Sequence, residues 1–317
     1  MSGARPVLLL NRSEVNSLLE WPSLLGATQQ ALVDLAGGDS LPSVASQLVV
    51  PGAALHLKSG ALKSPPVISV KANLRPDSGS TSGAILVFDH EAQVLTTVMS
   101  SGDLTAMRTA AIAAVAARAL VGPDRVSVAL VGAGPVARKV AEALEYLEIP
   151  SEVRVWSRSR ASADMLLEST RESDIDYRVF DDVDDAIRGA ELIVSCTPAR
   201  SPMIRSESLA PGAVILAMGA DTAGKRELAA GVLESATIYA DVREDALKVG
   251  ESAYLAEGES SRVENIGNLF LPNPVERASG NRIVFDSVGS SAVDAAVVAL
   301  VLAGAAEKGL GHTVDLD

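Results

Sequence analysis

The stretch Val126-Ser-Val-Ala-Leu-Val-Gly-Ala-Gly-Pro-Val-Ala137 decides the fold of this chain. Its first half is a β-branched apolar run typical of a buried strand, and the residues that follow it have the composition of a helix. Where the two meet, Gly132 permits a tight turn, Gly134 lets the backbone approach a pyrophosphate, and the small Ala137 lets the helix pack closely on the strand. The free N–H groups at the start of such a helix bind phosphate. Because a second apolar strand, Val153–Trp156, follows at the right distance, the sequence predicts a dinucleotide site.

The end of that second strand indicates which dinucleotide binds. A site for NAD usually carries Asp or Glu there, which accepts hydrogen bonds from the ribose 2′-hydroxyl. This chain has Ser157-Arg158-Ser159-Arg160 instead. Hydroxyl and guanidinium groups without a carboxylate suit a 2′-phosphate, so we expect NADP(H) to be preferred over NAD(H). A solvated basic turn is the alternative, because exposed arginines are common in loops.

The composition is typical of a globular protein. A length of 317 residues is enough for two domains. The formal net charge of −13 argues against nucleic acid or an anionic membrane as a partner. Glycine, proline or charged residues interrupt the apolar runs, and the first residues lack the apolar core of a signal peptide. We therefore expect a cytoplasmic protein without a membrane-spanning helix.

Cysteine and histidine are scarce. The single Cys196 excludes an internal disulfide, and with only His56, His90 and His312 available the sequence predicts no metal site. Cys196 ends an apolar strand, where a small buried side chain is more common than a nucleophile.

Strand and helix patterns divide the chain into two domains. Before residue 121, β-like runs separated by Gly, Pro and Ser predict an antiparallel or mixed sheet, with strands at 47–50, 54–57, 67–70, 84–89 and 94–99. After residue 121, strands alternate with helices, as in a parallel sheet. The final helix, about 291–308, is too apolar to be exposed and is expected to pack on the first domain. We predict an α/β protein with a Rossmann-type doubly wound parallel sheet over 121–290 and a smaller α+β substrate-binding and dimerisation domain from 1–120 plus about 291–317.

Several motifs resemble the ornithine cyclodeaminase/μ-crystallin family, in order and spacing, over nearly the whole chain. They are Val70-Lys-Ala-Asn73, Leu104-Thr-Ala-Met-Arg-Thr-Ala-Ala111, Val131-Gly-Ala-Gly134, Met218-Gly-Ala-Asp-Thr-Ala-Gly-Lys-Arg-Glu-Leu228 and Phe285-Asp-Ser-Val-Gly289. The resemblance implies a homodimer joined through the substrate domain. It also implies a Rossmann domain on which the substrate lies over the nicotinamide.

Two residues of these motifs are candidates for catalysis. Lys71 follows the apolar strand Val67–Val70, where a buried amine is costly without a function; by the resemblance it meets the carboxylate or imine end of the substrate. Asp221 follows the strand Ala213–Met218, at the edge of a parallel sheet where ligands bind. By the resemblance Asp221 is the proton donor and acceptor, and a helix N-cap is its alternative role.

The glycine motif and the resemblance together predict the contacts of the cofactor. The expected set is Ser80, Arg108, Thr109, Gly132, Gly134, Pro135, Val136, Ala137, Ser157, Arg158, Ser159, Thr197, Met218, Lys225 and Ser287. Val288 is expected to line the substrate pocket. For Arg108, near the start of an Ala-rich helix, an ordinary solvated position is the alternative.

The chain departs from the cyclodeaminases where they hold their substrate. Their Pro-Arg pair supplies a cation for the α-carboxylate, whereas this chain has Pro42-Ser43. The Glu that faces the distal amine of ornithine is replaced by His56, with Lys58 beside it. A diamino acid needs a carboxylate for its far ammonium, so we expect His56 and Lys58 to bind a different substrate. Simple exposure of both side chains is the alternative.

These observations favour NAD(P)H-dependent reduction of a small imino or keto acid, equivalently an amino-acid dehydrogenase. A cyclodeaminase, which uses bound NAD(P) catalytically on a diamino acid, is the first alternative. A non-catalytic NADP-dependent binding protein is the second, although Lys71 and Asp221 are both retained. The expected partners are a small imino, keto or amino acid and a second copy of the chain.

Overall fold

The computed structural model describes residues 6–41, 43–77, 81–272 and 281–316. It separates into two compact units, Met1–Arg108 with Ser290–Asp317 and Thr109–Gly289, called here the first and the second unit. The division falls within the helix α3 (Gly102–Val121) rather than at residue 120.

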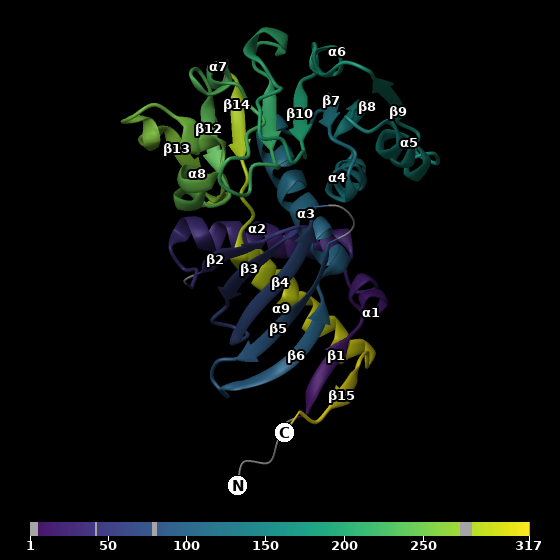
Figure 1. The fold of residues 1–317 in the computed structure, drawn as a ribbon, viewed down its shortest axis with the longest axis vertical. Helices are drawn as coiled ribbons and strands as arrows, with labels where there is room; N and C mark the ends of the chain where they lie inside the picture. Colours follow the sequence, from purple (N-terminus) through teal and green to yellow (C-terminus); the bar gives the residue numbers. More distant parts are fainter. Residues whose placement is uncertain (1–5, 42, 78–80, 273–280, 317) are drawn as a thin grey trace. The chain divides into compact units, whose positions relative to one another are not determined.

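The first unit contains a seven-stranded mixed sheet in the order β15-β1-β6-β5-β4-β3-β2 (Figure 1). β1 runs parallel to β6 and the other pairs are antiparallel. β1 and β15, which bring the two ends of the chain side by side, were not among the predicted strands. The strands are β1 (Val7–Leu10), β2 (Val44–Val50), β3 (Ala53–Ala61), β4 (Val67–Pro76), β5 (Ser82–Asp89), β6 (Val94–Ser100) and β15 (His312–Val314).

Helices cover one face of this sheet. They are α1 (Arg12–Asn16), α2 (Trp21–Gly37) and α9 (Ser291–Lys308). α9 packs against α2 and against β3 and β4. A Cβ atom added to Gly60 of β3 would lie 2.1 Å from the carbonyl oxygen of Ser291, so glycine lets the start of α9 approach the sheet. This close approach brings a charged residue of α9 onto β4, as described below.

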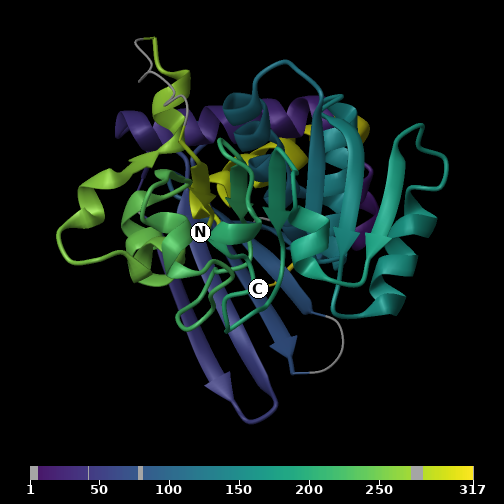
Figure 2. The same ribbon diagram turned by 90° about the horizontal axis from the view of Figure 1, so that it is seen from above.

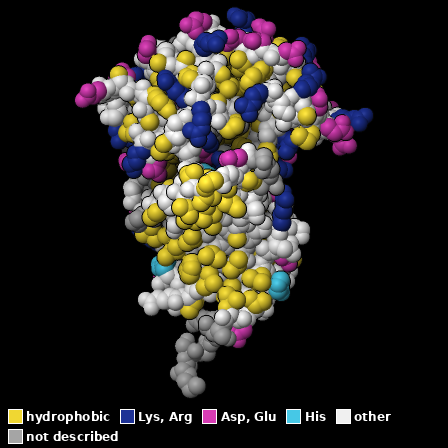
Figure 3. Space-filling model, in the orientation of Figure 1, with side chains coloured by type: hydrophobic (Ala, Val, Ile, Leu, Met, Phe, Trp, Pro, Cys, Tyr) yellow, Lys and Arg dark blue, Asp and Glu magenta, His cyan; other side chains and the backbone are white. Residues whose placement is uncertain are grey.

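The two faces of the sheet differ in character. Lys71 and Asn73 on β4 are buried on one face, and the alternate residues Val70, Ala72 and Leu74 lie on the opposite face. On that opposite face, large apolar side chains are exposed: Val44, Leu48, Val50, Leu74 and Leu86. Figure 3 shows hydrophobic side chains gathered over the strands of the first unit. We call the surface formed by these five exposed side chains of the sheet the apolar sheet face.

The second unit is built on eight parallel strands in the order β13-β12-β14-β11-β10-β7-β8-β9. The strands are β7 (Val126–Val131), β8 (Pro150–Trp156), β9 (Asp176–Phe180), β10 (Leu192–Ser195), β11 (Val214–Ala217), β12 (Thr237–Ala240), β13 (Val263–Asn265) and β14 (Ile283–Asp286). Helical segments connect them: α4 (Pro135–Tyr146), α5 (Arg160–Ser169), α6 (Val183–Ile187), α7 (Ala230–Leu233), α8 (Arg243–Val249), η1 (Ser206–Ser208), η2 (Glu251–Tyr254), η3 (Glu259–Arg262) and η4 (Ile266–Phe270).

The chain winds outward from β7 in both directions. β7, β8 and β9 lie side by side, as the teal strands of Figure 2 show, and the chain then returns to place β10 on the other side of β7. This reversal creates a switch point between β7 and β10, at whose carboxyl edge doubly wound sheets bind their ligands. The central strands β7, β10, β11, β12 and β14 are almost wholly buried and mostly apolar, as parallel strands covered on both faces must be. The predicted α/β fold class is confirmed.

α3 is the one helix of the described residues that is long and apolar enough to cross a membrane. Of its most apolar window, 72% is buried within the structure. Apolar length alone is weak evidence for a membrane span in such a helix, because a core helix shows the same composition.

Candidate functional site

The glycine loop after β7 has the geometry that a pyrophosphate requires. Gly132 has φ +111°, and a Cβ atom there would lie 2.8 Å from the carbonyl oxygen of Cys196, so both the turn and the neighbouring strand require glycine. Gly134 is the N-cap of α4, with Pro135 in the first turn, and no heavy atom lies within 4 Å of an added Cβ. The N-terminus of α4 therefore meets open space where the N–H groups and the helix dipole favour an anion. These residues fit a dinucleotide.

The residues after β8 take separate roles. Ser159 is the N-cap of α5 and accepts a hydrogen bond from the N–H of Ser162. Arg160 pairs with Asp164 at 2.9 Å, one turn along the same helix. Arg158 is exposed and forms no ion pair within the described ranges. Of the two predicted basic groups, Arg158 is thus the guanidinium that a bound anion can reach.

A buried carboxylate, Glu227, joins the carboxyl ends of β10 and β11. Its Oε1 atom accepts from the N–H and the hydroxyl of Thr197 at 2.8 and 2.7 Å. Its Oε2 atom accepts from the hydroxyl of Ser195 and the N–H of Gly219, both at 2.9 Å. Burial raises the pKa of Glu227, while these donors oppose the rise. The four bonds fix Thr197, a predicted cofactor contact, and the turn that leads to Asp221.

Asp221 lies just beyond this turn and is paired with Lys225, two residues before Glu227. Its side chain is partly exposed and that of Lys225 is nearly buried. The alternative of a helix cap is wrong, because the segment from 219 to 228 forms no helix and α7 begins only at Ala230. The pair places one carboxylate and one ammonium at the ligand-binding edge of the parallel sheet.

A second buried carboxylate organises the loop after β14. Asp241, at the end of β12, accepts hydrogen bonds from the Ser287 hydroxyl at 2.7 Å and from the N–H groups of Val288 and Gly289 at 3.1 and 2.8 Å. The N–H of Ser287 donates to Ala217 of β11. Ser287 and Val288, predicted cofactor and substrate contacts, are therefore held at the same carboxyl edge as Thr197, Met218 and Asp221.

In the first unit, Lys71 and Arg108 meet on one carboxylate, Asp294 of α9. The Nζ atom of Lys71 lies 2.7 Å from both oxygens of Asp294. The Nε atom of Arg108 lies 2.9 Å from Oδ1, and the three side chains are at most 5% exposed. The pKa of Lys71 is lowered to about 7, first by burial and then by Arg108, against the opposing effect of Asp294. The pKa of Asp294 is itself held below its ordinary value, because the nearby cations outweigh its burial.

This cluster carries an unmatched positive charge. Two cations face one carboxylate, and while the Nε atom of Arg108 pairs with Asp294, its Nη1 atom is buried without a hydrogen bond to the described residues. Buried donors of this kind usually have partners. The arrangement is suited to receive an anion.

The strand register places Lys58 and His56 beside the cluster. Lys58 is opposite Lys71, and His56 is opposite Asn73 across the β3–β4 pair. Residues opposite each other share a face of the sheet, and Lys58 acts electrostatically on both Lys71 and Asp294. The imidazole of His56 also lies 3.5 Å from the amide of Gln47 on β2.

The structure therefore gathers the predicted residues into two groups. The first unit holds His56, Lys58, Lys71 and Arg108; the second holds Asp221 with the glycine loop, the strand-end serines and the loop after β14. Thr109 follows Arg108 in α3. Ser80 and Pro42 lie outside the described residues.

Three residues that organise these groups were missed from the sequence: Asp294, Glu227 and Asp241. Asp294 is the first charged residue in the apolar helix 291–306, and a lone carboxylate in such a helix usually has a partner. Glu227 stands between Arg226 and an apolar run, and nothing in its spacing separates it from an exposed residue. Asp294 had a readable signal and Glu227 did not.

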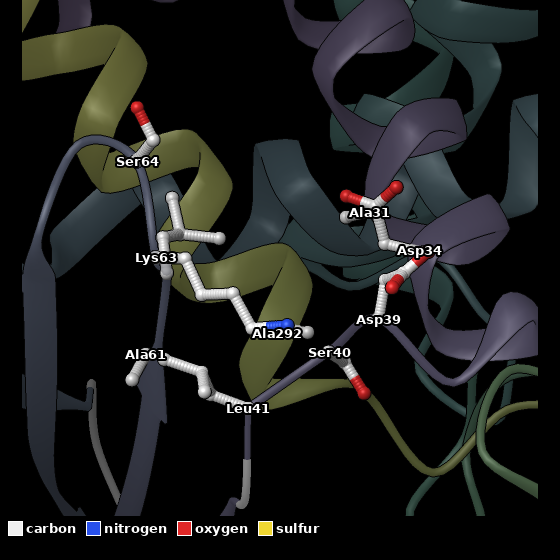
Figure 4. Close-up of a pocket in the computed structure, with 10 residues that line it drawn as sticks. Ala31, Asp34, Asp39, Ser40, Leu41, Ala61, Lys63, Ser64 and Ala292 are labelled. Carbon is white, nitrogen blue, oxygen red and sulfur yellow. The ribbon is translucent and has the colours of Figure 1, made fainter.

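The part of the chain that the structure describes contains no group of three or more potential metal ligands. Burial, and the nearby Glu227, raise the pKa of the Cys196 thiol well above its ordinary value, which makes a thiolate nucleophile unfavourable. A hollow of about 310 Å³ between α2 and the end of β3 is lined by Asp34, Asp39, Lys63 and Ala292 among others (Figure 4). None of the predicted site residues lines it.

Comparison with known proteins identifies the family. The model of the ornithine cyclodeaminase/mu-crystallin family matches residues 67–309. The chain belongs to this family. The ketimine reductase mu-crystallin of Macropus fuliginosus is 31% identical over 218 residues, 68% of this chain and 67% of that protein. The alanine dehydrogenase of Archaeoglobus fulgidus is 27% identical over 323 residues, 97% of this chain and 98% of that protein.

The protein also resembles, over nearly its whole length, a solved structure of an archaeal alanine dehydrogenase dimer with bound NAD. Its TM-score is 0.91 at 25% identity, with 99% of this chain and 100% of that chain covered. The predicted family and fold are confirmed.

Proposed function

We propose that this protein reduces a small 2-imino acid, or a 2-keto acid together with an amine, to the amino acid with NADPH as the hydride donor. The observation that carries the proposal is the buried cluster of Lys71, Arg108 and Asp294. Its excess positive charge and the unfilled Nη1 donor of Arg108 match the α-carboxylate that every substrate of this class carries. A charge-assisted contact with a carboxylate is strong where the geometry is buried and fixed.

Arg108 is therefore assigned to the substrate's carboxylate in this proposal. The expectation that it contacts the cofactor stays a prediction. Both roles agree with its burial, but its ion pair with Asp294 places it with Lys71.

The proton chemistry falls to Asp221. When bound, the nicotinamide supplies the hydride that reduces the substrate carbon. Asp221 then delivers or withdraws a proton at the substrate nitrogen, and its ion pair with Lys225 holds its side chain in position. The hydrogen bonds of Glu227 hold the turn before Asp221 in place, which keeps the acid at a fixed position.

The cations around Lys71 disfavour a diamino acid as substrate. Lys58 and Lys71 face each other across β3 and β4, and His56 lies on the same face. A second ammonium on the substrate would meet like charges there, which is unfavourable. This feature supports net reduction over cyclodeamination.

The preference for NADPH rests on the turn after β8. Ser157 and Arg158 are available there and no carboxylate stands at the strand end. A guanidinium binds a 2′-phosphate with charge-assisted hydrogen bonds, while NAD offers it only a hydroxyl.

A homodimer through the apolar sheet face completes the proposal. Five large apolar side chains between 36% and 63% exposed share this face of one sheet, and such patches on a protein surface usually mark an interface. The archaeal alanine dehydrogenase described above is a dimer. The proposed occupant of the face is a second copy of this chain.

A panel assay tests the proposed activity. NADPH consumption is followed with pyruvate, glyoxylate, oxaloacetate and cyclic imines, with and without ammonia or methylamine, and with the methyl ester of each accepted acid. We expect turnover of at least one acid and little turnover of its ester, since the ester lacks the anion. Lys71→Met should abolish most of kcat/KM, and the matched control Lys63→Met, an exposed lysine of the same unit, should not. Ammonia release from a diamino acid without NADPH consumption would instead show a cyclodeaminase, and binding without turnover would show a binding protein.

A further inference from the structure

We propose that Asp294 is a positioning residue of the reaction: its carboxylate fixes Lys71 and Arg108 in the arrangement that receives the substrate, and it keeps Lys71 charged. The inference rests on the proposed function, because it assigns to Lys71 the task of binding the substrate's carboxylate. It adds a residue from the C-terminal helix to a site whose predicted members end at Val288.

The geometry shows that three separate elements depend on this one side chain. Lys71 comes from β4, Arg108 from α3 and Asp294 from α9, and Lys71 and Asp294 are 223 residues apart in the sequence. Both oxygens of Asp294 accept from Nζ of Lys71 at 2.7 Å, and Oδ1 also lies 2.9 Å from Nε of Arg108. Since both carboxylate oxygens are engaged, neither cation can turn away without losing its contact.

The electrostatics require an anion at this position. The charged or titratable groups that act on Lys71 are Arg108 from α3, Lys58 from β3 and Asp294 from α9, and His56 lies on the same face of β3. Burial and the two cations lower the pKa of Lys71, and Asp294 alone raises it. Asp294 lies in the first turn of α9, where the helix dipole favours its negative charge. Without Asp294 we expect Lys71 to lose its proton below neutral pH, and a neutral amine binds a carboxylate poorly.

A positioning role and a merely structural role differ in their pH dependence. A buried pair that served only the fold would, when broken, lower stability and reduce kcat/KM by the same factor at every pH. A residue that holds the charge of Lys71 must, when neutralised, move the pH at which kcat/KM falls. The pH profile of kcat/KM reports the ionisation of the free enzyme, so it separates the two roles.

The decisive variant is Asp294→Asn, which keeps the shape of the side chain and removes its charge. With NADPH saturating and an accepted acid as substrate, the alkaline fall of kcat/KM in the parent should lie near pH 7. In the variant this fall should begin about one pH unit or more lower. Above that pH, kcat/KM of the variant should drop about tenfold for each further pH unit. The matched control is Asp103→Asn, the same exchange in a partly exposed pair with Arg12 of the same unit, and its profile should equal that of the parent.

A second pair of variants covers the case in which Asp294→Asn does not fold. Asp294→Asn alone leaves the cations Lys71 and Arg108 buried together without a carboxylate. Arg108→Met removes one of these cations, so adding Asp294→Asn to it leaves only Lys71, which can become neutral. Adding Asp294→Asn in that background should again lower the alkaline limb by about one unit. A limb that stays at the same pH in either comparison overturns the inference. A parent protein that turns over none of the acids overturns the proposed function instead, so the two failures are distinguishable.

Discussion

Replacing Glu227 with glutamine should destabilise the protein, although the two side chains have the same shape. Each carboxylate oxygen accepts from one backbone N–H, Oε1 from Thr197 at 2.8 Å and Oε2 from Gly219 at 2.9 Å. A glutamine has one oxygen, so in either orientation its NH₂ group faces one of these N–H groups, which the strand ends hold in place. A buried donor left without an acceptor costs about 1–3 kcal/mol. The side chain is 0% exposed, so water cannot relieve that cost.

The assay is equilibrium unfolding in urea, followed by circular dichroism. The second unit should lose about 1–3 kcal/mol of unfolding free energy, equivalent to a melting temperature lower by about 2–12 °C. The matched control is Glu191→Gln. One oxygen of Glu191, Oε2, accepts both the N–H and the hydroxyl of Ser127, so a glutamine oxygen can replace it and the change should stay within about 0.5 kcal/mol. A Glu227→Gln protein as stable as this control would refute the reasoning.

Four further predictions concern the cofactor, the proton transfer, the pH dependence and the assembly. Arg158→Ala should weaken NADPH binding about ten- to hundredfold, because the lost charge-assisted contact contributes about 1.5–3 kcal/mol, and NADH binding should change little. Equal affinity of the parent for both cofactors in a fluorescence titration would contradict this prediction. Asp221→Asn should reduce kcat by at least about 10²-fold with NADPH affinity kept and a normal thermal melt; retained turnover would return Asp221 to a structural role. Burial raises the pKa of Glu251 to about 8, so between about pH 4.5 and 8 the folded protein holds a proton there that the unfolded chain has lost. Stability should therefore fall as pH rises through this range. In Glu251→Gln the urea midpoint should change less with pH, and a pH dependence equal to that of the parent would refute the assignment. Light scattering at micromolar concentration should give a dimer, and Leu48→Glu with Leu74→Glu should give a monomer; a monomeric parent would remove the proposed interface.

Much of the fold could be predicted because the pattern is local. The strand around Val128 and the glycine turn at Gly132 are set by adjacent residues, and the breaks at Gly, Pro and Ser placed most strands of the first unit near their observed positions. The short strands β1 and β15 were missed because each is stabilised by the other end of the chain. No local pattern of three or four residues indicates such a pairing.

The site was only partly predictable for the same physical reason. Asp221 and the glycine loop follow strands, so their place at the sheet edge could be deduced from topology. The contact of Lys71 with Asp294 joins β4 to α9 across most of the sequence, and spacing carries no information about it. The cap role considered for Asp221 was wrong because Glu227 holds its segment by side-chain bonds instead of a helix.

We propose that this family member transfers a hydride to the α-carbon of a substrate whose carboxylate is bound by Lys71 and Arg108. The most direct measurement uses NADPH deuterated at C4 of the nicotinamide, on the transferred face, with an accepted keto acid and methylamine. We predict one deuterium at Cα of the N-methyl amino acid for each NADPH consumed, seen by mass spectrometry and NMR. A product without deuterium at Cα, or ammonia released from a diamino acid while NADPH stays unchanged, would contradict the claim.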